Sequence, residues 1–368
     1  MDRTPKIFIS PSKYVQGSGV ILDIGKLITP FGERVAVAGG VRGLRETHTG
    51  RKNSFRDNGV AQAEYGFGGD STDMEIGRLA DFIIRNNCSV AVACGGGKVI
   101  DTVKAAAEDA GAAAVIVPTV ASNDSPCSAL SVIYNEDGTF SRLRPLKRNP
   151  DIVLVDTSII SRSPVRFLVA GMGDALATWF EADACYKSGA VNLPGGTITA
   201  ACVALARLCY ETLIEFGFEA KQACQAQTVN TALERVVEAN TLLSGIGFES
   251  GGVAVAHALS EGISMIEEAH TCMHGEAVAF GLLVQLMLES KKNDEIGKVF
   301  DFCFNVGLPV TLSDLNIDNN DVAAIRRVAE TAAAPGRPTD NMPFKVSPEM
   351  MYDAIFAADA KGRELKGY

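Results

Sequence analysis

Three of the four histidines in this 368-residue chain, His257, His270 and His274, fall within one window of eighteen residues. Neutral imidazole is the most common metal ligand near physiological pH. On a single helix His270 and His274 would share a face, because they are four positions apart. No glutamate follows His270, so the H-E-x-x-H zinc motif is absent. A lone histidine on a helix is usually satisfied by a hydrogen bond, but three in so short a stretch predict a metal site.

A further ligand must come from outside this window, and the best candidate is Asp174 in the run AGMGDALATWFEA. An isolated aspartate behind a Gly-x-Gly turn at a helix N-terminus is more often only a cap. If it is a ligand instead, two imidazoles and one carboxylate leave a coordination position open for water or substrate, as catalytic zinc requires. Spacing alone does not decide which two histidines take part.

A second candidate site lies where a buried run ends in Gly95, Gly96 and Gly97 and a helix is expected to begin near Lys98. Glycines let backbone N–H groups approach an anion, and the helix adds the positive end of its dipole, so the geometry suits a pyrophosphate. It is not a P-loop, because valine and not serine or threonine follows Lys98. A tight turn that binds nothing is an equally good interpretation of this loop taken alone.

The next buried run favours the ligand-binding interpretation. It ends in a polar segment, PTVASNDSPCSALSVIY, which carries Thr119, Ser122, Asn123, Asp124 and Ser128. In an open α/β sheet, the loops beyond the carboxyl ends of neighbouring strands line the ligand crevice. We therefore expect these polar side chains to lie close to the glycine loop.

Short apolar runs alternate with helical patterns over the first part of the chain. Continuous runs rich in alanine and β-branched residues are typical of strands buried on both faces of a parallel sheet. Thr72 and Glu75 predict a capping box that begins a helix, and Asn135–Gly138 predict the turn of a hairpin within residues 128–144. The expected strands are residues 35–40, 89–97, 112–119 and 151–156, and the expected apolar stripe of the helix is Ile76, Leu79, Ala80, Ile83 and Ile84.

The character of the sequence changes after Pro164. Alanine, leucine, methionine and glutamate then dominate at helical spacing. The sequence therefore predicts an α/β nucleotide-binding domain with a mainly parallel sheet over residues 1–163, followed by an all-α metal-binding domain over residues 164–368. Two such domains are expected to form a ligand cleft between them.

Composition narrows the class of partner. A net charge of −10 argues against nucleic acid or an anionic membrane as a standing partner. No apolar run approaches the roughly 20 residues of a membrane span, and the first residues show no apolar stretch of signal-peptide length. The nine cysteines are odd in number and form no C-x-x-C pair, which is typical of reduced thiols in a cytoplasm. We expect a cytoplasmic enzyme with a small-molecule substrate.

Five runs carry a resemblance to a known family: GGGKVIDTVKA, PTVASNDSPCSALSVIY, GMGDALATWFEA, ALERVVEANTLLSGIGFESGG and HGEAVAFG. They resemble the glycerol dehydrogenases of the iron-containing/polyol alcohol dehydrogenase superfamily, whose fold is shared with dehydroquinate synthase. The resemblance runs from about Tyr14 to past Gly307. It implies NAD-dependent oxidation of glycerol, or a related vicinal diol, to dihydroxyacetone by hydride transfer at a catalytic zinc, in a homo-oligomer that is often an octamer.

The resemblance also implies a role for particular residues. Asp124 touches the polyol, and His270 becomes an active-site neighbour that carries a proton away, not a metal ligand. Relatives of the iron type have a histidine four residues after the aspartate, where this chain has Thr178, so Zn²⁺ is favoured over Fe²⁺. The implied metal ligands are Asp174, His257 and His274; the implied cofactor-binding residues are Gly96, Gly97, Lys98, Asp101, Thr119, Ser122, Ser128, Leu130 and Tyr134.

Two positions depart from the family pattern. Many relatives have an aspartate after the first strand of the nucleotide domain, which disfavours a 2′-phosphate, whereas this chain has Gly40 with Arg42 nearby. This weakens the preference for NAD over NADP. Relatives also have a histidine three residues after the first histidine ligand, where this chain has Ser260, which affects substrate preference and any proton relay through that position.

Two alternatives remain at the level of the sequence. A glycerol-1-phosphate dehydrogenase or a dehydroquinate synthase-like enzyme would need cationic residues for a phosphate, but the window from His257 to His274 contains Glu261, Glu267 and Glu268 and no lysine or arginine. This favours a neutral polyol. A non-catalytic nucleotide- or metal-binding protein of the same fold is the other alternative, because fold does not fix function.

Overall fold

The computed structural model describes residues 4–368, apart from the side chain of Asn293. These residues form two compact units, and neither is continuous in sequence. The α/β unit comprises Ser10–Leu168 and Gln222–Gly245; the helical unit comprises the described residues up to Ile9, then Val169–Lys221 and Ile246–Tyr368. A division into separate domains at residue 163/164 stays a prediction.

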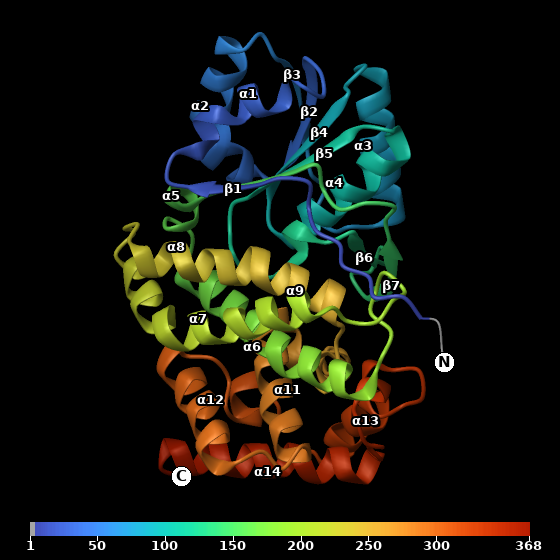
Figure 1. Ribbon diagram of the computed structural model, residues 1–368, viewed down its shortest axis with the longest axis vertical. Coiled ribbons are helices and arrows are strands. Elements are labelled where there is room, and N and C mark those ends of the chain that lie inside the picture. The colour runs from blue at the N-terminus through green and yellow to red at the C-terminus, as the bar shows by residue number, and fades with distance from the viewer. Residues whose placement is uncertain (1–3) are drawn as a thin grey trace. The chain divides into compact units, whose positions relative to one another are not determined.

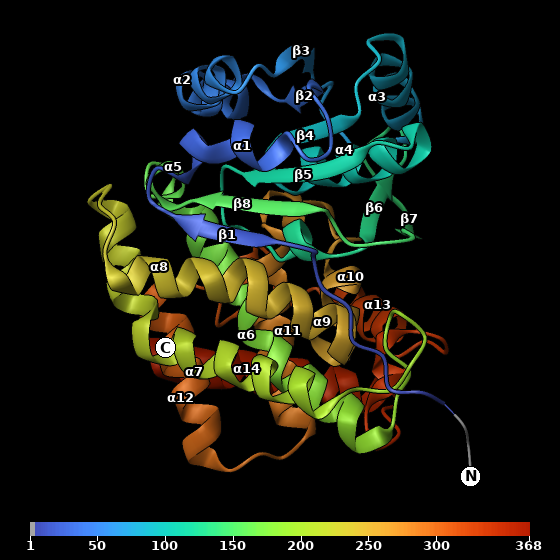
Figure 2. The ribbon, with the colours of Figure 1, turned by 45° about the horizontal axis from the view of Figure 1, so that its top comes forward.

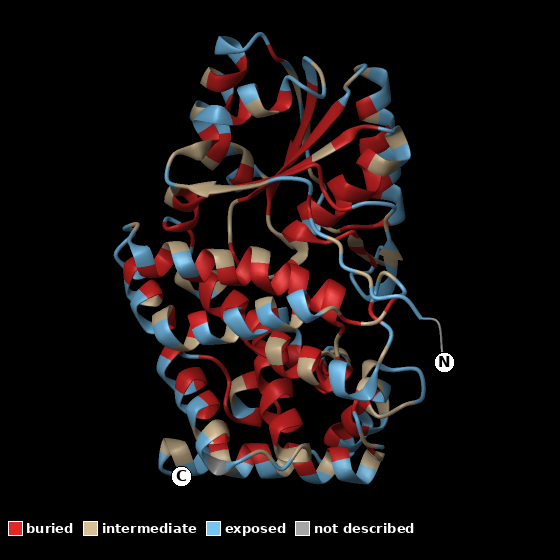
Figure 3. Ribbon diagram, in the orientation of Figure 1, coloured by how far each residue is buried: buried red, intermediate tan, exposed pale blue. Residues whose placement is uncertain are grey.

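The α/β unit is built on a six-stranded sheet in the order β1-β8-β5-β4-β2-β3, and all its pairings are parallel (Figures 1 and 2). The four strands expected from the sequence are present, and the parallel α/β fold is confirmed. Their interior residues are almost completely buried, as continuous apolar runs require (Figure 3). They are β2 (Arg34–Gly39), β4 (Val90–Gly95), β5 (Ala113–Pro118) and β8 (Ile152–Asp156).

The two edge strands were not expected from the sequence. They are β1 (Tyr14–Gly17) and β3 (Ala61–Gly66). No residue of either is fully buried, and β3 carries polar side chains in the run AQAEYG. An edge strand has a neighbour on one side only, so it needs no continuous apolar run and gives a weaker signal in the sequence.

Helices cover the central strands of this sheet. Helices α1 (Ile24–Ile28) and α2 (Val41–Asp57) pack against alternate strand residues such as Val35, Val37 and Val92, while α3 (Asp73–Arg85) and α4 (Gly97–Ala110) lie across the sheet from them in Figure 1. Shorter or later elements of the same unit are α5 (Thr157–Ile160), α8 (Thr231–Glu238) and a π-helix at Ala239–Leu243.

Helix α3 meets its expectation only in part. Thr72 is the N-cap, and its hydroxyl accepts from the Glu75 N–H at 3.2 Å. The reciprocal half of the capping box is absent, because the Glu75 carboxylate accepts from the Gly68 N–H at 2.8 Å instead. Ile84 is 57% exposed, so the expectation of a five-residue buried stripe was wrong at its end.

The hairpin expected within residues 128–144 is confirmed. Strands β6 (Leu130–Tyr134) and β7 (Phe140–Pro145) pair antiparallel as a separate two-stranded sheet. The Asn135 N–H donates to the C=O of Thr139 and closes the turn. This hairpin places Tyr134 beside Thr72, at the start of α3.

The C-terminal part is helical, as predicted, and no strand follows β8 among the described residues. Its helices are α6 (Val165–Ser188), α7 (Ala200–Gln225), α9 (Ser244–Gly251), α10 (Val255–Ile263), α11 (His274–Leu288), α12 (Asn293–Val306), α13 (Val322–Ala332) and α14 (Pro348–Lys366).

Among the residues described here, no single helix is long and apolar enough to cross a membrane, although the pair Thr231–Gly251 and Val255–Ile263, bent by 101°, meets both criteria together. All nine cysteines are free thiols.

Candidate metal and nucleotide sites

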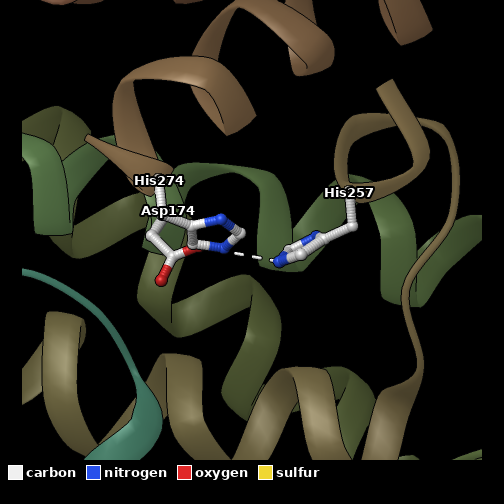
Figure 4. Close-up of side chains that lie close together, drawn as sticks. All are labelled: Asp174, His257 and His274. Atoms are coloured by element: carbon white, nitrogen blue, oxygen red, sulfur yellow. Dashed lines mark ion pairs between the residues drawn. The ribbon is translucent and has the colours of Figure 1, made fainter. Parts of the chain in front are cut away.

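The three ligands implied by the family resemblance come together in the helical unit, each from a different helix. Asp174 lies on α6, His257 on α10, and His274 is the first residue of α11. The Nε2 atoms of His274 and His257 lie 3.3 and 3.6 Å from Asp174 Oδ1 (Figure 4). One ligand atom from each residue lies within 4.8 Å of the others, which is the grouping that a single metal ion requires.

Glycines on α11 let these three helices approach closely. A Cβ at Gly275 would lie 1.8 Å from the C=O oxygen of Ala170 on α6, and one at Gly281 would lie 2.4 Å from that of Ala256 on α10. Real Cβ atoms do not come this close to backbone oxygens, so only glycine fits at these two positions. Each contact is close in sequence to a ligand. Because Gly275 and Gly281 have no side chain, α11 can pack closely against α6 and α10, and this close packing brings the three ligands together.

A buried glutamate that was not predicted from the sequence, Glu181, orients His257. Glu181 Oε2 lies 2.6 Å from His257 Nδ1, and Oε1 accepts from the N–H groups of Ala254 and His257 at 2.7 and 3.0 Å. A carboxylate at Nδ1 fixes the ring orientation and leaves Nε2 for a metal. The signal was available, because Glu181 lies seven residues after Asp174 and a helix repeats its face at that spacing.

The charges of the site fit a divalent cation. Asp174 is 1% exposed, and neither of its carboxylate oxygens has a hydrogen-bond partner. Burial favours the neutral form of Asp174, but the His274 and His257 imidazoles outweigh it and hold the pKa of this carboxyl well below its usual range. Burial opposes charge on His257 too, yet Glu181 and Asp174 raise the pKa of its imidazole well above the usual value. A metal ion bound at His257 Nε2 would take the place of the proton that these two carboxylates stabilise on the imidazole.

Three other positions singled out by the family resemblance, Ser260, Thr178 and His270, differ in their exposure and in their contacts. Ser260 Oγ lies 3.5 Å from His274 Nδ1, so the residue that replaces the family histidine contacts the other imidazole of the site. Thr178 is buried one turn after Asp174. His270 is exposed, in a 3₁₀-helix at Glu267–Thr271, and its Nε2 lies 3.1 Å from the C=O oxygen of Ser264.

His270 and His274 therefore do not share a helix face. Extended backbone at Cys272 and Met273 separates the 3₁₀-helix from α11, so the arrangement expected for two residues four apart on one helix does not form. The role of His270 in proton transfer stays a prediction.

The glycine loop of the α/β unit has the geometry expected for an anion site. Strand β4 ends at Gly95, and α4 begins at Gly97. Gly96 is the N-cap of α4, and no side chain accepts a capping hydrogen bond there. The Thr119 N–H donates to the C=O of Gly95 at 3.0 Å, which joins this loop to the end of β5. The backbone donors of the first turn of α4 are therefore not taken by a capping side chain.

Lys98, the expected pyrophosphate contact, already has an anionic partner. Its ammonium pairs with Asp70 and lies 5.2 Å from the centroid of the Tyr134 ring. The structure thus brings two expected cofactor residues together, from α4 and from the end of β6. Asp70 was not expected from the sequence, because it lies in the loop before α3, far from both partners along the chain.

Asp101 and Ser128, also expected at the cofactor, belong to a buried network around Lys104. The Lys104 ammonium lies 3.0 Å from Asp101 Oδ1 and donates to Ser128 Oγ at 3.2 Å and to the C=O of Ser125 at 2.9 Å; it also donates to the C=O of Leu130. Burial raises the pKa of the Asp101 carboxyl against the lowering effect of Lys104. Asp101 Oδ2 accepts from the Val132 N–H at 3.2 Å. This network fixes the segment that leads into β6.

The remaining expected residues lie in the loop after β5. Thr119 and Ser122 are half-buried, whereas Asp124 is buried at the start of a 3₁₀-helix, Ser125–Cys127, and its Oδ2 accepts from Ser244 Oγ at 3.0 Å. At the neighbouring end of β2, Gly40 is the N-cap of α2, and Arg42 Nη2 donates to the C=O of Arg162 at 3.4 Å.

Known proteins resemble this chain. A sequence model described as iron-containing alcohol dehydrogenase matches residues 11–157. A glycerol dehydrogenase of Escherichia coli O6:H1 is 47% identical over 99% of each chain, and a glycolaldehyde reductase of Halobacterium salinarum is 40% identical over 98% of this chain and 99% of its own. The crystal structure of glycerol dehydrogenase from Schizosaccharomyces pombe matches with a TM-score of 0.94 at 34% identity, over 100% of this chain and 94% of the other.

The chain therefore belongs to the iron-containing alcohol dehydrogenase family, a class of oxidoreductases. Within that family, the resemblance to the glycerol dehydrogenases that five short motifs indicated is confirmed over nearly the full length. The relatives match the chain over nearly its full length, although most of the aligned positions differ in residue type.

Proposed function

We propose that this protein oxidises glycerol, or a closely related vicinal diol, to dihydroxyacetone with NAD as hydride acceptor and a zinc ion held by Asp174, His257 and His274. The observation that carries the proposal is the buried Asp174 carboxylate, which faces two imidazole nitrogens and has no hydrogen-bond partner for either oxygen. The relatives from Escherichia coli O6:H1 and Schizosaccharomyces pombe are both named glycerol dehydrogenase, which supports the same substrate.

The donor set supports zinc over iron. One carboxylate and two imidazoles give three protein ligands and leave an open position, as in catalytic zinc sites. Thr178 occupies the place where a fourth protein ligand would be expected for iron. When bound, such an ion supplies Lewis acidity that favours loss of a proton from the substrate hydroxyl. The protein's own part is to keep His257 Nε2 and His274 Nε2 available, through the contacts of Glu181 and Ser260.

For the cofactor, we propose that the loop at Gly96 and Gly97, together with Lys98, binds the pyrophosphate. Its uncapped helix N-terminus and the nearby ammonium suit two phosphate charges. Thr119, Ser122, Ser128, Leu130 and Tyr134 would line the rest of the dinucleotide. Asp101 would act indirectly, because its carboxylate is already paired with Lys104 and the Val132 N–H.

For the substrate, we propose that Asp124 accepts a hydrogen bond from a hydroxyl that is not oxidised and that His270 relays the released proton. Both roles follow from the family resemblance. The buried position of Asp124 supports its role, because a carboxylate held by a neighbouring hydroxyl offers a fixed acceptor.

A direct test combines metal analysis with an assay at the absorbance of reduced nicotinamide. The metal-replete wild type is expected to contain about one zinc per chain and to reduce NAD with glycerol. The double variant Asp174→Ala, His274→Ala is expected to lose both properties. If it keeps its metal and its polyol oxidation, the site assignment is wrong.

A substrate and cofactor comparison addresses the finer points. Glycerol is expected to outperform glycerol 1-phosphate, and reduction of glycolaldehyde tests the activity in the name of one relative. Gly40→Asp is expected to raise the ratio of NAD to NADP turnover about tenfold, because an acid at this position repels a 2′-phosphate. A Cβ at Gly40 meets nothing within 4 Å, so the variant fits without strain.

The assembly and the compartment belong to the same proposal. We propose a homo-oligomer, with an octamer as the form suggested by the family resemblance, and a cytoplasmic location suggested by nine free thiols. Sedimentation of the purified protein tests the first point, and fractionation of the source cells tests the second.

A further inference from the structure

The π-helix at Ala239–Leu243 has no part in the function proposed so far. Its defining bond runs from the N–H of Ser244 to the C=O of Ala239, five residues earlier. This bond interrupts the regular ladder that would otherwise continue from α8 into α9. π-helical turns are rare, and they occur frequently at functional sites.

Two fully buried side chains of this region reach the loop that carries Asp124. Asn240 Nδ2 donates to the C=O of Ala121 at 3.0 Å and to the C=O of Leu168 at 3.1 Å. Ser244 Oγ donates to Asp124 Oδ2 at 3.0 Å. All five residues belong to the α/β unit, so these contacts lie within one compact body.

The Asn240 amide is fully buried, and of its two polar atoms only the nitrogen is hydrogen-bonded. Its Oδ1 is buried and has no hydrogen-bond partner. A buried unsatisfied oxygen destabilises the fold, so its presence here needs a reason. The two bonds from Nδ2 supply one, because they fix the backbone immediately before Ser122.

We propose that Ser244 is a positioning residue, which holds the Asp124 carboxylate in the orientation that receives one substrate hydroxyl, while Asn240 holds the backbone of the same loop. The inference rests on the proposed function, in which Asp124 contacts the polyol. Ser244 itself touches no substrate. It acts by restricting the rotation of a carboxylate that is only 8% exposed.

This role makes Ser244 a determinant of substrate specificity. A polyol has a second hydroxyl for Asp124 to accept, whereas a simple secondary alcohol such as 2-propanol has none. The benefit of an oriented carboxylate is therefore confined to the polyol. A purely structural role for Ser244 would change the turnover of both substrates alike.

The experiment is a double-mutant cycle on the zinc-replete enzyme with the variants Ser244→Ala, Asp124→Asn and both together. We expect Ser244→Ala to lower kcat/KM for glycerol about tenfold or more, because a hydrogen bond to a charged group is lost. The value for 2-propanol and the KM for NAD should change by less than about twofold. In the Asp124→Asn background, Ser244→Ala should cause no further loss, because the two residues act as one unit.

Thr241→Val is the matched control, because it removes a buried hydroxyl from the π-helix that immediately precedes Ser244. The Thr241 hydroxyl donates to the C=O of Val237 at 2.6 Å and lies 2.8 Å from the Tyr14 hydroxyl. This variant should lower the midpoint of unfolding as Ser244→Ala does, yet keep the ratio of glycerol to 2-propanol turnover.

Three results would overturn the inference alone: an equal loss for both substrates, additive effects of Ser244→Ala and Asp124→Asn, or a kinetic defect in Thr241→Val that matches Ser244→Ala. A wild-type enzyme that does not oxidise glycerol would overturn the proposed function and this inference with it. The two failures are therefore distinguishable.

Discussion

Glu181 in the helical unit and Lys104 in the α/β unit are both buried charged residues that hold other site residues in place. Glu181 acts on one side chain, the His257 imidazole, and on the backbone just before it. Lys104 acts mainly on the main chain, because it binds the carbonyl oxygens of Ser125, Ser128 and Leu130. In both regions a buried charge fixes other residues, but in the helical unit it fixes a side chain and in the α/β unit it fixes the main chain.

The difference follows from what each site must present. A metal ion binds side-chain atoms, so the orientation of one ring decides whether its nitrogen is available. A dinucleotide in an α/β fold is held largely by backbone groups at strand ends, so the course of the main chain decides the fit. A single carboxylate is enough for the first task, whereas the second needs a cation with several oxygen partners.

The largest effect is expected at Asp174, the proposed metal ligand. Asp174→Ala should lower glycerol oxidation by about a thousandfold or more, because it removes a proposed ligand of the ion that would activate the hydroxyl. Elemental analysis should show loss of zinc. Thr178→Val, one turn along α6, is the control and should retain the metal. Full zinc content in Asp174→Ala would remove the basis for the metal site.

On the nucleotide side, Lys104→Met should destabilise the protein by about 3–5 kcal/mol, because it leaves the Asp101 carboxylate buried without its cation. Urea unfolding measures this change. The exposed Lys147→Met should change the free energy of unfolding by less than about 0.5 kcal/mol. A loss below about 1 kcal/mol in Lys104→Met would show that the network is not a structural centre.

On the metal side, Glu181→Gln should weaken zinc binding about 10- to 100-fold, because the partner that orients His257 loses its charge. Competition with a chelator measures this affinity. Glu261→Gln is the control. Glu261 is on α10, the helix that carries His257, but it pairs with Arg337 at 2.7 Å, so its substitution should leave zinc affinity unchanged. Equal zinc affinity in wild type and Glu181→Gln would end the parallel between Glu181 and Lys104.

A smaller effect is expected where helices α6 and α11 meet. Gly275→Ala should destabilise the protein by about 1–3 kcal/mol, because the added methyl group would overlap the C=O of Ala170. Gly297→Ala on α12 is the control, since its Cβ meets nothing within 4 Å, and it should stabilise the protein by about 0.4–1 kcal/mol. Thermal unfolding of both variants checks the difference, and equal shifts would contradict the close-packing argument.

Much of the fold was predictable because buried parallel strands carry a strong signal. The runs that became β2, β4, β5 and β8 are apolar on both faces and short, as buried parallel strands require. The edge strands β1 and β3 lack that signal. The segment Gln222–Gly245 was expected in the helical domain, because helical periodicity shows that a segment is helical but not which body it packs against.

The candidate site was predictable to the extent that its chemistry is local in sequence. The histidine cluster and the glycine loop stand out by residue type alone. Glu181, Asp70 and Lys104 do not, because each has an ordinary place in a helix or loop and gains its role only from a partner that the fold brings near. The relation of His270 to His274 depends on a break between helices, which spacing cannot reveal.

The ion pair between Lys98 and Asp70 has a consequence for the release of a bound nucleotide. A lysine that already has a counter-ion exchanges one anion for another when it binds a phosphate. The electrostatic free energy gained is therefore smaller than for an unpaired lysine. If Lys98 contacts the pyrophosphate as proposed, this contact adds little net binding free energy, and it slows release of the nucleotide correspondingly little. An oxidoreductase of this kind must release its reduced nucleotide in every catalytic cycle. Weaker net binding at the pyrophosphate favours that release.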